Sequence, residues 1–152
     1  MDLCFIYRNI WIMTKTEIFE LLEEKYEAYC NPAFIESDPV SIPHHFEDER
    51  DIEISGLISA TIAWGQRTSI IKNANDAMIR MGNEPYRFVM EHSKADLKHF
   101  DGFVHRTFNA TDLQQFVKSL RNIYSNYNAL EDVFSEGWNQ EANLKNSIHH
   151  FK

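Results

Sequence analysis

Glycine, cysteine and proline are scarce in this chain of 152 residues, which has 5 glycines, 2 cysteines and 4 prolines. The glycines occur singly, whereas a phosphate-binding loop of the nucleotide-binding kind needs a glycine-rich run. Cys4 and Cys30 lie far apart without a CxxC partner, so the sequence indicates neither a disulfide framework nor a zinc site. Reduced thiols favour a cytoplasmic protein.

Long apolar runs and alternating runs of β-branched residues are also missing. The apolar opening at residues 3–12 is interrupted by Arg8 and Asn9, and no small-residue cleavage site follows it. We therefore expect neither a signal peptide nor a membrane partner. Without alternating runs, we expect no sheet of any size.

Basic residues are fewer than acidic residues. The chain has 15 Lys and Arg and 23 Asp and Glu, which gives a net charge of −8. An acidic surface repels phosphate unless its basic side chains gather on one face. The hydrophobic share of 43% is ordinary for a globular protein, and the length suits one domain.

The first clear helix is predicted after Met13. Thr14 and Glu17 have the spacing of a capping box, and apolar residues then recur at three- and four-residue steps up to Tyr29. Translation starts at Met1 or at Met13 in this interpretation. We expect residues 1–13 to be an N-terminal extension and residues 14–152 to form a single helical domain, incomplete at its C-terminus.

Further helical stripes cover most of the chain. A loop without regular structure is expected over residues 31–43, followed by a buried helix over residues 48–64 that Gly65 ends. Thr68 is expected to cap the next helix, which reaches Gly82. Later helices begin near Pro85, at a cap on Thr111 and near Leu130, and a last stripe starts at Leu144. The predicted fold is a compact, orthogonal all-α domain.

Metal and catalytic signals are weak. His44, His45 and Asp51 are imaginable metal ligands, but no HxxxH or HExxH spacing is present, and the acids suit a helix N-terminus. No Gly-x-Ser-x-Gly elbow occurs, and neither cysteine has a histidine nearby. We therefore expect no metal and no cofactor, and leave open whether the protein is an enzyme.

Two basic segments are the candidate binding residues. Gln66, Arg67, Thr68 and Lys72 stand where a helix begins, and helix N-termini with added positive charge attract anions. His105 and Arg106 form a basic turn ahead of a capped helix. The alternatives are a plain helix-helix corner at Gly65 and a simple ion pair for Arg106.

Several short segments together resemble an uncharacterised bacterial family, catalogued as a domain of unknown function. These segments are residues 34–39, 42–44, 51–56, 63–68, 85–86 and 105–109. The resemblance implies a longer protein that continues into a basic region beyond Phe151.

That family is in turn distantly similar to the helix-hairpin-helix DNA glycosylases, on residues 57–74. The similarity implies the first helical domain of such enzymes, whose Gln-bearing turn approaches the duplex, and only Gln66 and Arg67 map onto it. It also implies double-stranded DNA as a partner, through a longer form of the protein. The alternative is a non-enzymatic interaction or scaffold module with a protein partner, for which the surplus of 11 Phe, 6 Tyr and 3 Trp would supply the interface.

Overall fold

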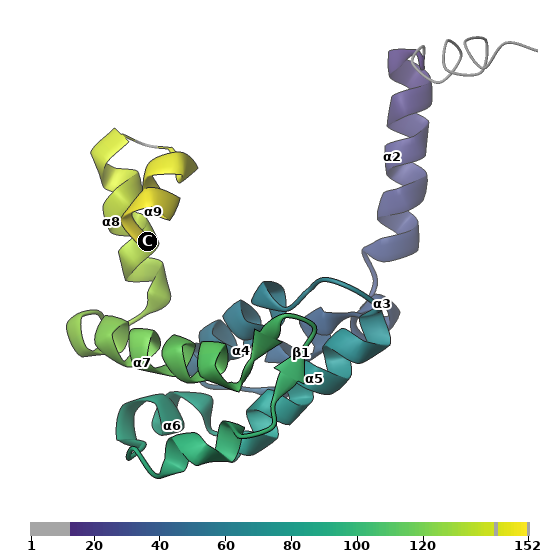
Figure 1. Ribbon diagram of the computed structural model, residues 1–152. Coiled ribbons are helices and arrows are strands. Elements are labelled where there is room, and N and C mark those ends of the chain that lie inside the picture. The colour runs from purple at the N-terminus through teal and green to yellow at the C-terminus, as the bar shows by residue number, and fades with distance from the viewer. Residues whose placement is uncertain (1–12, 142, 152) are drawn as a thin grey trace, which may run out of the picture. The chain divides into compact units, whose positions relative to one another are not determined.

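The computed structural model describes residues 13–141 and 143–151 (Figure 1). The chain divides into two compact units, Met1–Glu36 and Ser37–Lys152. Most of the expected N-terminal extension, Cys4 included, lies outside the described residues, and the domain boundary near residue 14 stays a prediction. Cys30 is an exposed free thiol.

Helix α2 (Lys15–Tyr29) begins with the predicted capping box. The Thr14 backbone N–H donates to Glu17 at 2.7 Å, and the Glu17 N–H donates to the Thr14 hydroxyl at 3.3 Å. None of the α2 side chains is buried within this unit, although the Tyr29 ring meets the edge of Phe34 with 5.6 Å between centroids. The predicted helix and its capping box are confirmed, whereas its apolar side chains stay exposed within this unit.

The prediction of a loop without regular structure over residues 31–43 is wrong. The segment holds a short helix, α3 (Pro32–Glu36), and two 3₁₀ turns, η1 (Pro39–Ser41) and η2 (Pro43–His45). Each begins with a proline, which the first helical position tolerates because its N–H has no intrahelical partner. Proline was therefore a sign of helix starts here.

The larger unit is built on α4 (Glu49–Thr61) and α5 (Arg67–Arg80), which pack against each other. Helix α6 (Pro85–Glu91) packs on α4, and α7 (Ala110–Asn126) packs on α6 and on the 3₁₀ turn η3 (Asp96–Phe100). The all-α prediction is confirmed. The largest fully buried side chains include Phe100, Phe103, Ile42, Ile54, Ile58, Ile62, Met78, Leu113 and Leu120.

A two-residue hairpin was not predicted. Strands β1 (Val104–His105) and β2 (Phe108–Asn109) pair in antiparallel register, too short for an alternating pattern to show in the sequence. The expected cap at Thr111 is also wrong. Asn109 caps α7, since its side chain accepts from the Thr111 N–H at 2.8 Å and its own N–H donates to Asp112 at 2.9 Å.

Acidic residues of α4 hold the starts of two later helices as well as its own. The Asp48 carboxylate caps α4, while Asp51 accepts from the backbone N–H of Tyr86 at 2.7 Å, at the start of α6. Glu53 accepts from the backbone N–H groups of Leu130 at 2.9 Å and Glu131 at 3.1 Å, at the start of α8 (Leu130–Glu141). Negative charge at a helix start is favourable, so α4 fixes where α6 and α8 begin.

Helices α8 and α9 (Leu144–Phe151) form a close hairpin. A Cβ atom on Gly137 would lie 2.6 Å from the Ser147 Cα, so only glycine fits between the two backbones. The rings of Phe134 and Phe151 stack with centroids 4.9 Å apart. Across residues 13–141 and 143–151, no helix combines the length and apolar character needed to cross a membrane.

Candidate functional site

The first candidate segment is the junction between α4 and α5. Helix α4 ends at Thr61, and Gly65 takes a φ of +121°, a backbone conformation that side chains with a Cβ rarely adopt. The N-cap of α5 is Gln66 rather than the predicted Thr68, and the Gln66 side chain makes no capping hydrogen bond. The Gln66 amide is therefore not used to close the helix start.

His105 ties the hairpin to this junction. Its Nδ1 lies 2.8 Å from the side-chain nitrogen of Asn73, and its Nε2 lies 3.2 Å from the carbonyl oxygen of Trp64. An amide nitrogen only donates and a carbonyl oxygen only accepts, so Nδ1 accepts and the Nε2–H donates. The ring is 2% exposed, which makes His105 a residue that positions its neighbours rather than a surface contact.

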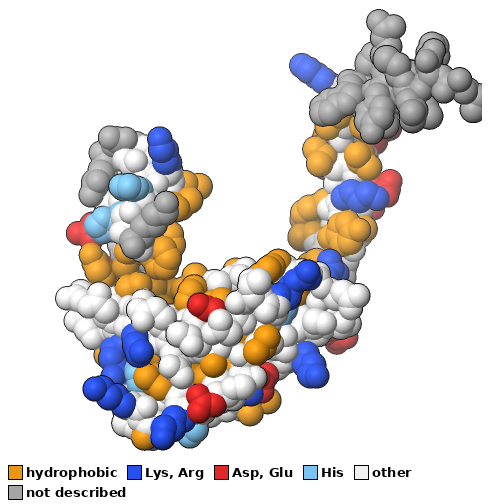
Figure 2. Space-filling model, in the orientation of Figure 1, with side chains coloured by type: hydrophobic (Ala, Val, Ile, Leu, Met, Phe, Trp, Pro, Cys, Tyr) orange, Lys and Arg blue, Asp and Glu red, His pale blue; other side chains and the backbone are white. Residues whose placement is uncertain are grey.

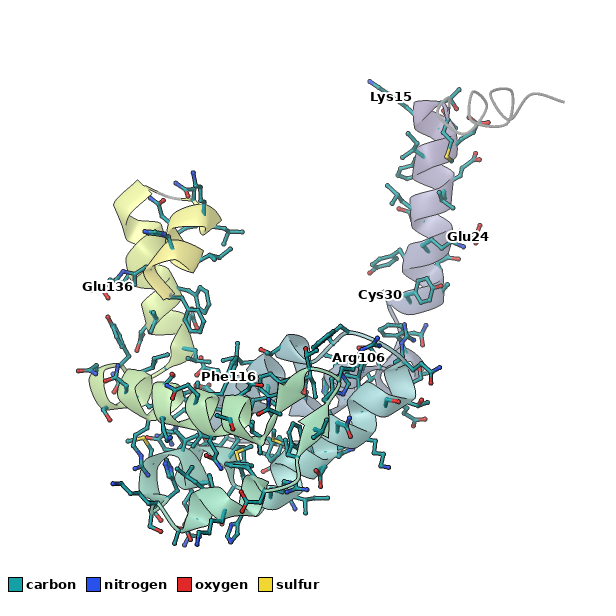
Figure 3. The ribbon with its side chains drawn as sticks, viewed as in Figure 1. Lys15, Glu24, Cys30, Arg106, Phe116 and Glu136 are labelled. Carbon is teal, nitrogen blue, oxygen red and sulfur yellow. The ribbon has the colours of Figure 1, made fainter. Side chains whose placement is uncertain are left out.

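Arg106 follows at the tip of the hairpin and is exposed. Its φ of +56° places it in the left-handed region, and its guanidinium lies 5.6 Å from the centroid of the Trp64 ring. A Cβ atom on Gly65 would approach Nη1 of Arg106 to 2.7 Å. Figure 3 shows the labelled Arg106 side chain between the hairpin and the start of α5. A glycine at position 65 thus lets the guanidinium lie against the junction.

These contacts enclose a pocket of about 370 Å³. The structure brings the predicted residues Gln66, His105 and Arg106 together around it. Its full lining is Trp64, Gly65, Gln66, Ser69, Asn73, His105 and Arg106.

The other predicted residues, Arg67, Thr68 and Lys72, belong to the first two turns of α5 and do not line this pocket. Arg67 pairs with Asp38, with 3.7 Å between Nε and Oδ2, and lines a second pocket. Thr68 and Lys72 are exposed and four residues apart, so they share one face of the helix. Figure 2 shows blue basic side chains scattered among neutral surface on the visible face of the larger unit. Arg67 and Lys72 are five residues apart, which places them on different sides of α5, and Arg106 comes from the hairpin, so the three do not share one helix face.

The weak metal candidates do not come together. Asp51 receives the hydrogen bond at the start of α6, and burial raises the pKa of its carboxyl. His44 and His45 are exposed at the end of η2. Within the described part of the chain, no group of three or more His, Cys, Asp and Glu side chains is arranged to hold a metal ion.

Trp64 and Asn73 were not among the predicted site residues. Trp64 was predicted to belong to a buried helix, but it follows the end of α4 and is 40% exposed. Asn73 joins the site only through His105, 32 positions away along the chain. Helical spacing contains no signal for such a contact, although a polar Asn among the apolar positions of α5 was a weak hint.

Comparison with known proteins gives one family. The profile described as "Protein of unknown function (DUF2400)" matches residues 38–152. No curated protein and no solved structure matches the chain. The matched range contains the whole junction and the hairpin, and it leaves out α2.

Proposed function

Because the chain belongs to the DUF2400 family, whose description names no activity, we propose a function from the junction itself: binding of double-stranded DNA. One observation carries the proposal. The two candidate segments, 39 positions apart when counted from Arg67 to Arg106, meet through the hydrogen bonds of His105 to Asn73 and to Trp64.

The physical basis is an anion site at the start of α5. Backbone N–H groups of the first turn and the helix dipole favour a phosphate there. Arg67 is paired with Asp38, so Lys72 and Arg106 supply the net positive charge near this helix start. Their charge acts locally, because charges beyond about 10 Å are screened at physiological salt.

Trp64 and Gln66 supply groups for the bases. The Gln66 amide is not used as a helix cap, and glutamine pairs readily with adenine edges. The exposed Trp64 ring offers an apolar face for stacking. The similarity of residues 57–74 to the Gln-bearing turn of the helix-hairpin-helix DNA glycosylases supports the finer proposal of a role in DNA repair.

The experiment is a salt titration of duplex binding by fluorescence anisotropy with the full chain. If Lys72 and Arg106 each neutralise one phosphate, the plot of log K against log salt has a slope of about −1.8, from roughly −0.9 per phosphate. Arg106→Ala should reduce the slope to about −0.9 and weaken binding of every sequence alike.

The matched control is Lys118→Ala, which removes one exposed cation from α7. Its slope should equal that of the unmodified protein. Equal loss of binding in both variants would mean that only net charge matters and would overturn the junction as the site. Absence of salt-dependent binding in the unmodified protein would overturn DNA binding altogether.

A second candidate function is a protein-interaction module, which the exposed apolar side chains of α2 favour. Six of them are at least 40% exposed within their unit: Ile18, Phe19, Leu21, Leu22, Tyr26 and Tyr29. Figure 2 shows orange side chains along this helix. Phe19→Glu should abolish a self-associated species in sedimentation velocity if this face binds protein, and should leave DNA binding unchanged.

A further inference from the structure

A second cavity lies between η1, α4 and the start of α5, and the proposed DNA contact does not use it. Its volume is about 470 Å³, within the range of small-molecule sites. Its lining is mostly apolar: Pro39, Val40, Pro43, Gly56, Ala60, Ala63, Gly65 and Ile70, with Asp38, Ser59 and Arg67 as polar members.

The space exists because α4 presents small residues toward η1. Gly56, Ala60 and Ala63 recur at three- and four-residue steps, so they share one face of the chain as it leaves α4. Pro39 and Pro43, the first residues of η1 and η2, form the opposite wall. Small and apolar side chains from both segments therefore offer contact surface to an apolar group.

Ser59 is the feature that points to a ligand. It is 3% exposed, it lines the cavity, and its hydroxyl has no hydrogen-bond partner among the described residues. A buried hydroxyl without a partner is costly, and such groups usually meet a ligand or an ordered water. Ser55, one turn earlier on α4, is satisfied by the Ile52 carbonyl at 3.1 Å, so a serine in this helix need not stay unpaired.

The charge in the cavity is balanced. Asp38 and Arg67 pair at 3.7 Å, and the Asp38 carboxylate also accepts from the Val40 N–H at 3.0 Å. A ligand with a net charge would be attracted by one member of this pair and repelled by the other. The site therefore favours an uncharged ligand.

From these features we propose that the cavity between η1 and α4 binds an uncharged aromatic compound with one hydrogen-bonding group, which reaches the Ser59 hydroxyl. The ring lies between the alanine and proline walls, and the polar group supplies the missing partner of Ser59. Arg67 lines this cavity but is paired with Asp38, whereas Lys72 and Arg106, the cations of the proposed DNA contact, do not line it.

The test uses phenol and toluene as a matched pair of probes. Binding of each probe to the full chain is monitored in NMR titrations through the amide chemical shifts of the protein. Phenol should bind with a dissociation constant on the order of 1 mM, as expected for so small a ligand. Saturable shifts should centre on residues 56–63. Toluene should bind about two- to tenfold more weakly, because one hydrogen bond is lost.

Ser59→Ala makes the test specific. Toluene should bind this variant at least as well as phenol, whose hydroxyl then has no partner, whereas Ser135→Ala, which removes an exposed serine from α8, should keep the preference for phenol. Ala60→Leu should fill the cavity and abolish binding of both probes. Ala28→Leu, a matched change on the exposed surface of α2, should leave binding intact.

Three outcomes would overturn the cavity as a binding site. The first is the absence of saturable shifts with either probe, which would leave an ordered water as the partner of Ser59. The second is an unchanged preference for phenol in Ser59→Ala, and the third is unchanged binding in Ala60→Leu. Benzoate or benzylamine binding more tightly than phenol would refute the choice of an uncharged ligand.

Discussion

Removal of the Glu53 carboxylate should destabilise the larger unit more than any other single surface change on α4. Glu53→Ala takes away the acceptor of three hydrogen bonds: from the Tyr124 hydroxyl at 2.8 Å and from the N–H groups of Leu130 and Glu131. Loss of a helix cap costs about 1 kcal/mol. The Tyr124 side chain, in a residue only 6% exposed, loses its partner at a cost of about 1–3 kcal/mol.

The free energy of unfolding should therefore fall by about 2–4 kcal/mol, and the melting temperature by roughly 10 °C. Urea and thermal denaturation, followed by far-ultraviolet circular dichroism, measure both quantities. Glu47→Ala is the matched control, since Glu47 is exposed just before α4, and its effect should stay within about 0.5 kcal/mol.

A double-mutant cycle with Tyr124→Phe separates the hydroxyl contact from the cap. Tyr124→Phe alone should cost about 1 kcal/mol, and almost nothing when Glu53 is already alanine. Burial and the hydrogen bond to Glu53 raise the pKa of Tyr124, in agreement with a hydroxyl that donates to a carboxylate. Strictly additive effects, or a loss below about 1 kcal/mol for Glu53→Ala, would refute the assignment of Glu53 as the link between α4, α7 and α8.

Three further changes have defined outcomes. Gly65→Ala should lower the free energy of unfolding in urea by about 1–3 kcal/mol, because a φ of +121° strains any residue with a Cβ. An unchanged free energy of unfolding would contradict this backbone conformation at position 65. Gly137→Ala should separate α8 from α9, since its Cβ would lie 2.6 Å from the Ser147 Cα, and faster amide exchange confined to α9 would confirm it. Asp51→Asn tests pH dependence. Burial raises the pKa of Asp51 above 3.8, so its stabilising effect is full below 3.8 and is lost as pH rises through the raised folded pKa. The stability of the unmodified protein relative to Asp51→Asn should therefore fall as pH rises from below 3.8 through the raised pKa of Asp51, and a pH-independent difference would rule this out.

The helices themselves were predictable because helical periodicity and caps are local signals. The capping box at Thr14, the position of Pro85 and the buried stripe of α5 are all confirmed. Each depends on residues within about four positions of one another, which is the range over which a helix turn brings side chains together.

The arrangement of the candidate site was not predictable, since it depends on contacts between distant segments. His105 was proposed as a surface contact, yet hydrogen bonds to Asn73 and Trp64 bury its ring. Asp51 suited the start of α4 by position, yet its partner at α6 lies 35 positions away, and the partner of Glu53 at α8 lies 77 positions away. Spacing along the chain contains no information on such pairs.

The distant partners of α4 also make the larger unit depend on contacts between segments far apart in the sequence. Most contacts of an isolated helix form within nanoseconds to microseconds, but contacts across 35 to 78 positions must wait for loop closure. On a ribosome, the carboxylate of Glu53 emerges long before the start of α8 that it holds. The N–H groups at the start of α8 therefore reach their native acceptor only when a segment of 77 to 78 positions closes onto Glu53.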